Sequence, residues 1–140
     1  MKWNLKDIPM DIVQILKQDY QDFPVNQTYS IYAENVYFRD PLNEFRGVER
    51  FKQMLGFIDT WFRDIKMDLH HIRRSGNTIA MEWTLNMTSP LPWKPRLAIP
   101  GRTEFKLNDE ELIISHIDYW HTSRLDVLKQ NLFSAEKIKT

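Results

Sequence analysis

The chain has 140 residues, of which 42% are hydrophobic and 13% aromatic, so it can fill the core of one domain and still line a pocket. Nineteen basic and nineteen acidic residues cancel, which removes the positive surface that nucleic acid or an anionic membrane needs. The absence of cysteine excludes disulfides and cysteine-ligated metals. No segment approaches the roughly 20 apolar residues of a membrane span, so we expect a single cytoplasmic domain over residues 1–140.

The first part of the chain has helical periodicity. Ile8, Ile12, Ile15 and Leu16 recur at the spacing of an amphipathic helix. A second, shorter helix is expected over about residues 26–33. Residues 47–62 carry apolar side chains at every third or fourth position, which predicts the clearest helix of the chain.

The second part alternates with the period of β-strands. Residues 65–74 and 78–88 flank a short turn that contains Gly76, which is typical of a hairpin. Residues 89–101 carry four prolines around Trp93 and predict a stiff flap that does not pair as a strand throughout. Two more strands, 102–107 and 112–121, precede a final helix capped by Thr122 or Ser123. Helices followed by an antiparallel meander indicate an α+β fold.

The segment VYFRDPLNEFRG, residues 36–47, contains the first candidate site residue. On a strand, Val36, Phe38 and Asp40 share one face, so Asp40 follows two apolar side chains toward the interior. An acid held there can transfer protons. The alternative is that Asp40 only opens a turn, because Asp before Pro commonly does so, and the segment alone favours this interpretation.

The last strand carries a second group of polar residues. His116, Asp118 and Trp120 share one face, but neither face of this strand is cleanly polar. The pattern therefore leaves two interpretations open. His116 and Asp118 either point inward or form a pair that faces solvent.

The order of elements, the Asp-Pro segment and the last strand together resemble the nuclear transport factor 2-like (NTF2-like) superfamily, in which a curved sheet wraps around helices into a cone. Asp40, Pro41, Glu44, Arg46 and Gly47 follow one another as in ketosteroid isomerases, and this resemblance implies that Asp40 is a general base. The expected fold is therefore α+β, with a curved antiparallel sheet around the N-terminal helices.

A second resemblance concerns the last strand. Residues 80–85 and 115–120 resemble the polyketide-cyclase-like (SnoaL-like) branch, whose last strand carries a His-x-Asp pair facing the pocket. This implies that His116, Asp118 and Trp120 point inward, with Trp83 and Phe105 opposite. With its Pro-Trp-Lys-Pro flap, the chain most resembles an uncharacterised family of cyanobacteria and plants that has no assigned reaction.

The chain departs from ketosteroid isomerases at the oxyanion hole, which they build from a tyrosine and a protonated acid. The corresponding positions hold Leu16 and Thr103, so steroid-type isomerisation is disfavoured. A tyrosine from a shifted register is an alternative donor, and the candidates are Tyr20, Tyr29 and Tyr32.

Two functions from different classes fit these residues. The favoured one is a binding module for a small, largely apolar ligand oriented by Asp40, His116 and Asp118. Its expected wall residues are Phe38, Trp61, Trp83, Phe105 and Trp120, with Trp93 of the flap at the mouth. The second is a proton-transfer enzyme of isomerase, cyclase or dehydratase type that acts on a carbonyl-bearing small molecule. A third interpretation gives the polar trio a purely structural role.

Three further expectations concern partners and charge. The four histidines have no metal-ligand spacing, and nothing indicates a cofactor. Superfamily members often pair through the outer face of the sheet, which implies a homodimer that uses Ile117 and Tyr119. If Asp40 and Asp118 enter an aromatic pocket, burial raises the pKa of at least one of them.

Overall fold

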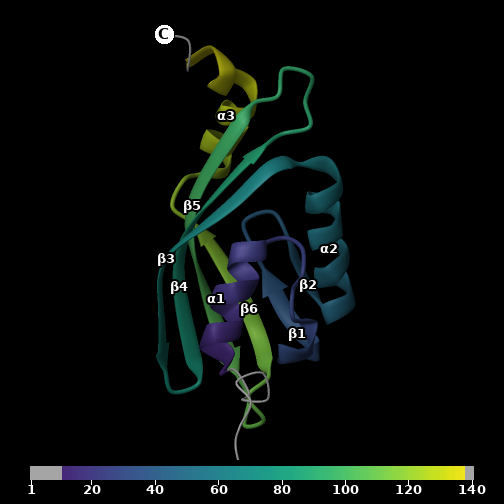
Figure 1. The fold of residues 1–140 in the computed structure, drawn as a ribbon, viewed down its shortest axis with the longest axis vertical. Helices are drawn as coiled ribbons and strands as arrows, with labels where there is room; N and C mark the ends of the chain where they lie inside the picture. Colours follow the sequence, from purple (N-terminus) through teal and green to yellow (C-terminus); the bar gives the residue numbers. More distant parts are fainter. Residues whose placement is uncertain (1–10, 138–140) are drawn as a thin grey trace, which may run out of the picture.

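In the computed structural model, which describes residues 11–137, the chain forms three α-helices, one short 3-10 helix and six strands. Helices α1 (Ile12–Asp22) and α2 (Val48–Trp61) lie against one side of a curved sheet, whereas α3 (Arg124–Lys137) lies at one end of the molecule beside β5 (Figure 1). Within this described part, no helix is both long and apolar enough to cross a membrane.

The strands form one sheet in the order β2-β1-β6-β5-β4-β3. Their bounds are β1 Tyr32–Arg39, β2 Glu44–Arg46, β3 Arg63–Ser75, β4 Thr78–Thr88, β5 Arg96–Leu107 and β6 Ile113–Trp120. The predicted α+β class is confirmed, and β3 to β6 form the expected antiparallel meander. One difference is that β6 pairs with β1 in parallel, so the sheet is mixed. This pairing joins segments far apart in the chain, and local sequence patterns do not specify it.

Helices α1 and α3 begin at a side-chain cap, whereas α2 begins after a glycine. At the start of α1, the carboxylate of Asp11 accepts a hydrogen bond from the backbone N–H of Gln14 at 3.0 Å. Helix α2 follows Gly47, whose φ of +114° is a conformation that residues with side chains rarely adopt. The backbone N–H of Asp126 donates to Ser123 Oγ at 3.0 Å, which confirms Ser123 as the cap of α3.

Two predicted elements differ from the structure. The helix expected over residues 26–33 is only the 3-10 turn η2, Tyr29–Ile31, and β1 starts directly after it. The competing interaction is with Asp19, whose carboxylate accepts from both the backbone N–H and the hydroxyl of Thr28 at 2.9 Å each. Because this contact fixes the preceding loop to α1, the chain enters the sheet earlier than its local pattern predicts.

The flap is also shorter than predicted, because β5 already begins at Arg96. Pro100 lies inside this strand opposite Thr84. A proline has no N–H to donate, but its carbonyl still accepts a hydrogen bond from the backbone N–H of His121 at 2.8 Å. Of the predicted flap, only residues 89–95 therefore remain outside the sheet.

The core lies between the inner face of the sheet and the helices. The alternation predicted for β4 is confirmed, since every second residue of this strand is buried: Ile79, Met81, Trp83, Leu85 and Met87. In the helices, Leu16 of α1 and Phe51 and Leu55 of α2 are buried against this layer. The core does not fill the whole interior, and the remaining space holds the candidate site.

Candidate functional site

A cavity of about 660 Å³ lies between the inner face of the sheet and the helices. Its wall is mostly apolar, and ten of its described lining residues are aromatic: Tyr20, Phe23, Tyr32, Phe38, Phe45, Phe51, Phe57, Phe62, Trp83 and Trp120. Four lining residues carry ionisable groups that can be charged near neutral pH, namely Asp40, Arg50, His116 and Asp118. A cavity with apolar walls and few convergent polar groups is typical of a site for a small molecule.

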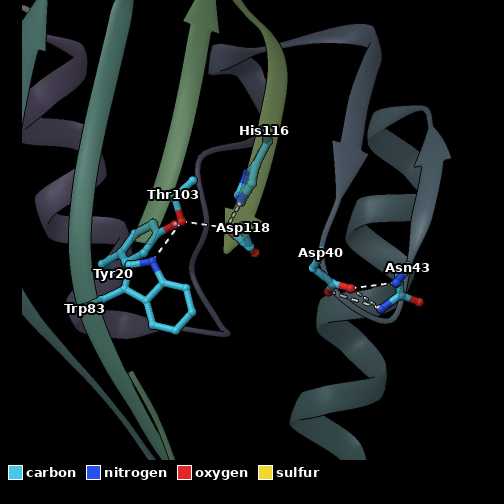
Figure 2. A network of polar contacts seen from close by, with 7 residues as sticks. All are labelled: Tyr20, Asp40, Asn43, Trp83, Thr103, His116 and Asp118. Atoms are coloured by element: carbon cyan, nitrogen blue, oxygen red, sulfur yellow. Dashed lines mark hydrogen bonds and ion pairs between the residues drawn. The ribbon is translucent and has the colours of Figure 1, made fainter. Parts of the chain in front are cut away.

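The carboxylate of Asp118 is held by two side chains of the sheet (Figure 2). Its Oδ1 atom accepts a hydrogen bond from Thr103 Oγ1 at 2.6 Å and one from His116 Nε2 at 2.9 Å. Thr103 lies directly opposite Asp118 on β5, and His116 precedes it by two residues on β6, so all three side chains share the inner face. The second carboxylate oxygen, Oδ2, takes part in neither bond.

The direction of these hydrogen bonds follows from the chemistry of the groups. Trp83 Nε1 can only donate, and it donates to Thr103 Oγ1 at 2.8 Å. The single hydroxyl proton of Thr103 is therefore free to point at Asp118. The hydroxyl of Tyr20 lies 3.5 Å from the same Thr103 oxygen. The buried donors thus converge on Asp118 and fix the orientation of its carboxylate.

A glycine makes room for this arrangement. Gly101 of β5 lies opposite Trp83 of β4. A Cβ atom added at Gly101 would be 2.6 Å from the Trp83 ring and 2.6 Å from the carbonyl oxygen of Tyr119. Because Gly101 has no side chain, the Trp83 indole can lie against β5 at this position and donate to Thr103.

His116 is surrounded by aromatic rings. Its ring centroid lies 4.7 Å from that of Phe105 and 4.8 Å from that of Phe38, and its side chain is 5% exposed. Nε2 donates to Asp118, whereas Nδ1 is buried without a hydrogen-bond partner. A proton on Nδ1 would be an unpaired buried donor, which is costly. With its hydrogen on Nε2, the ring therefore presents an unused acceptor at Nδ1.

Asp40 is held by its own turn. Its Oδ1 atom accepts from the backbone N–H of Leu42 at 2.7 Å and of Asn43 at 2.6 Å, and the Asn43 side-chain amide donates to both carboxylate oxygens at 3.1 Å. Asp40 also lines the cavity. The sequence left open whether Asp40 opens a turn or faces the interior. In the structure it does both, because it accepts the hydrogen bonds of its turn and also lines the cavity.

The surroundings of Asp40 change its ionisation. Burial raises its pKa above the ordinary value, and the charge of Asp118 acts in the same direction, while the hydrogen bonds from Leu42 and Asn43 oppose both. The prediction that burial raises the pKa of at least one of the two acids is confirmed for Asp40. The two carboxyl groups come from neighbouring strands, which explains why the charge of Asp118 affects the pKa of Asp40.

The structure brings most of the predicted site residues together. Asp40, His116 and Asp118 line the cavity, and so do Phe38, Trp83 and Trp120. The other three are not among the described lining residues. Phe105 is fully buried beside His116, its partner across β5 and β6. Trp61 is 54% exposed on α2, and Trp93 is 47% exposed with Nε1 donating to the backbone oxygen of Asn131 at 2.5 Å. A ligand contact for these three stays a prediction.

Sequence reasoning gave no role to Thr103 or Asn43. In the sequence, Thr103 stands out only as a departure from the isomerases, although a polar residue two positions before the inward Phe105 is itself a signal of a buried hydrogen bond. Asn43 follows Asp40 at the spacing of a side-chain-stabilised turn. Within the described part of the chain, no three acidic or histidine side chains gather closely enough to hold a metal ion.

Comparisons with known proteins agree with this fold. The model of a family described as "Uncharacterized conserved protein (DUF2358)" matches residues 10–116. No curated protein matches the chain. One similar solved structure is a hypothetical protein with a ketosteroid isomerase-like fold from Catenulispora acidiphila DSM 44928, in complex with trimethylamine. It is 19% identical, covers 92% of this chain and 98% of its own, and has a TM-score of 0.71.

Two further structures are similar over most of their length. An LEH-like epoxide hydrolase from M. tuberculosis is 16% identical, covers 91% of both chains and has a TM-score of 0.68. An NTF2-like protein of unknown function from Burkholderia pseudomallei K96243 is 12% identical, covers 84% of this chain and 95% of its own, and has a TM-score of 0.69. The predicted NTF2-like fold is therefore confirmed, and at these identities the likeness concerns the fold alone.

Proposed function

The chain belongs to the DUF2358 family of uncharacterized conserved proteins, and from this premise we propose that it binds a small, largely apolar molecule in its cavity. The observation that carries this proposal is the cavity itself. Its volume of about 660 Å³ falls in the usual range for small-molecule sites, roughly 300–1,000 Å³. Its polar groups are few and are held in place by hydrogen bonds. The complex of the Catenulispora protein with trimethylamine lends support, since a protein of similar fold has been found with a small organic molecule.

A neutral apolar dye tests ligand binding. We expect N-phenyl-1-naphthylamine to gain fluorescence with the protein, because the dye brightens in apolar surroundings. In Ile58→Trp, a larger side chain enters the cavity wall and should abolish this gain. Thr60→Trp places the same side chain on the exposed side of α2 and should retain it. Equal dye binding by both variants, or no binding by the unmodified protein, would contradict the proposal.

A proton-transfer enzyme of isomerase, cyclase or dehydratase type is the second candidate, and Asp40 favours it. This acid, with a pKa raised by burial, shares the cavity with Asp118, and two carboxyl groups in different environments are a frequent arrangement for acid–base catalysis. Asp40 would act as the base, and His116 with Asp118 as acid or polariser. Steroid-type isomerisation remains disfavoured, because Leu16 is buried in the core and Thr103 already donates to Asp118.

Deuterium exchange distinguishes the two candidates. Enones and β-keto compounds incubated with an enzyme of this type in heavy water should gain deuterium next to the carbonyl, as measured by mass spectrometry. Asp40→Asn should slow the exchange by about 100-fold, the usual contribution of a general base. A protein that only binds should give no exchange above the buffer rate.

We also propose that the protein forms a homodimer through the outer face of the sheet. Ile117 and Tyr119 are only half-buried there, and the guanidinium of Arg102 lies 4.2 Å from the ring centre of Tyr119. Sedimentation at tens of micromolar, an order-of-magnitude working concentration, should give the mass of a dimer. Ile117→Asp should shift it to a monomer, whereas a monomer in the unmodified protein would contradict this arrangement. A cytoplasmic location stays a prediction.

A further inference from the structure

Among the described residues that line the cavity, acidic side chains outnumber lysine and arginine. Two carboxyl groups, those of Asp40 and Asp118, face it from neighbouring strands, one directly after β1 and the other on β6, which pairs with β1 in parallel. Arg50 is the one lysine or arginine among the described lining residues, and it is an exposed residue whose guanidinium lies over the Phe45 ring at 5.4 Å. His116 donates from Nε2 to Asp118, and a second hydrogen on Nδ1 would have no acceptor. The interior therefore favours positive charge and repels an anion.

The network around Asp118 leaves two hydrogen-bond acceptors unused. His116 Nδ1 is a buried acceptor without a partner, and Asp118 Oδ2 is not used in the network that holds Oδ1. Three of the four amide side chains of the lining are already engaged, since Asn43 donates to Asp40, Gln27 to backbone carbonyls and Asn131 to the carbonyl of Val127. The fourth, Gln53, belongs to an exposed residue of α2. The hydroxyl of Tyr32 can serve as donor or acceptor. A ligand that matches the acceptors of His116 and Asp118 supplies hydrogen-bond donors.

The aromatic wall adds a third preference. The faces of aromatic rings carry negative charge density, and they attract a cation that lies within about 6 Å of the ring centre. Trp83 and Trp120 line the cavity together with Asp118. A cation near Asp118 is therefore close to both a carboxylate and indole rings, while the remaining apolar wall suits a hydrocarbon body.

We propose that the ligand is a small apolar amine, bound as its ammonium ion and recognised by Asp118 and Asp40. This inference rests on the proposed ligand binding and names the chemical class of the ligand. The ammonium supplies donors to His116 Nδ1 and Asp118 Oδ2, and its charge offsets the two carboxylates. The hydrocarbon part of the amine occupies the aromatic space.

Three matched probes test this proposal: cyclohexylmethylamine, cyclohexylmethanol and cyclohexanecarboxylate, which share one ring and differ in charge. By isothermal titration calorimetry at neutral pH, the amine should bind about tenfold more tightly than the alcohol, the factor expected from one charge-assisted hydrogen bond. The carboxylate should bind most weakly. Asp118→Asn should lower the affinity for the amine by about tenfold and leave that for the alcohol within about threefold.

Further variants control for loss of structure. Asp126→Asn removes an exposed acid of α3 and should leave all three affinities unchanged. Asp40→Asn should weaken the amine selectively, as Asp118→Asn does, and circular dichroism checks that each variant is folded. If Asp118→Asn does not fold, the affinities of Asp40→Asn for the amine and the alcohol decide whether a carboxylate recognises the ammonium.

The outcomes separate this inference from the proposed function. If the alcohol binds as tightly as the amine, or if the Asn variants weaken both probes equally, the amine inference is overturned while ligand binding in the cavity stands. If none of the probes binds and the naphthylamine dye also fails to bind, both proposals are overturned.

Discussion

The two carboxyl groups of the cavity are held in opposite ways. Asp40 is bound by the residues that follow it, through two backbone N–H groups and the Asn43 amide. Asp118 is bound by Thr103 and His116, and through Thr103 by Trp83 and Tyr20, which come from β5, β6, β4 and α1. The first arrangement is local and the second requires the folded sheet. We therefore expect changes around Asp118 to affect stability more than changes around Asp40.

The largest effect is expected from Gly101→Ala. The new methyl group would lie 2.6 Å from both the Trp83 ring and the Tyr119 carbonyl oxygen, and the backbone atom cannot easily move. The substitution should lower the free energy of unfolding by about 3 kcal/mol, the upper range for overpacking. Urea denaturation measures this change.

Gly56→Ala is the matched control for that substitution. Gly56 lies within α2, and a Cβ added there meets no atom within 4 Å. Alanine is favoured over glycine inside a helix, so this variant should gain about 1 kcal/mol. If both variants changed stability in the same direction, the close approach at Gly101 would not be the cause.

The second effect is expected from Thr103→Val, which keeps the shape of the side chain and removes its hydroxyl. Trp83 Nε1 then loses its acceptor and Asp118 loses one of its two donors. One buried unsatisfied donor costs about 1–3 kcal/mol, so a loss of about 2 kcal/mol is expected. Thr78→Val on β4 serves as a control and should stay within about 0.5 kcal/mol. A loss at Thr103 no larger than at Thr78 would contradict the network.

The same contrast explains what the sequence could predict. The turn at Asp40 is visible in the letters Asp-Pro-Leu-Asn, because all its partners lie within three residues. The alternation of β4 likewise predicts its buried face. The network around Asp118 could not be predicted, because Trp83 and Thr103 are 20 residues apart and Tyr20 and Thr103 are 83 apart. Resemblance predicted that His116 and Asp118 point inward, whereas their partners depend on how the strands register.

The third and smallest effect is expected from Asp40→Asn, and it depends on pH. Burial raises the pKa of Asp40 in the folded state, so its contribution to stability is fully present below the unfolded pKa and is lost as pH rises through the folded pKa. Asparagine does not titrate and can still accept the two backbone N–H groups. The variant should therefore gain stability relative to the unmodified protein between pH 3 and pH 7.

Urea denaturation at several pH values between these limits measures that difference. Asp19 is also buried with a raised pKa, but it is present in both proteins and cancels from the comparison. A stability difference that is constant over this pH range would contradict burial of the Asp40 carboxyl group.

The most direct test of the shared cavity is the pKa of Asp40, measured by carbon-detected NMR in the unmodified protein, in Asp118→Asn and in Asp126→Asn. Burial keeps this pKa above its ordinary value in all three proteins. Because the charge of Asp118 also raises it, the pKa of Asp40 should fall in Asp118→Asn and stay unchanged in Asp126→Asn. A pKa of Asp40 that is the same in all three proteins would show that the two carboxyl groups do not interact across one cavity.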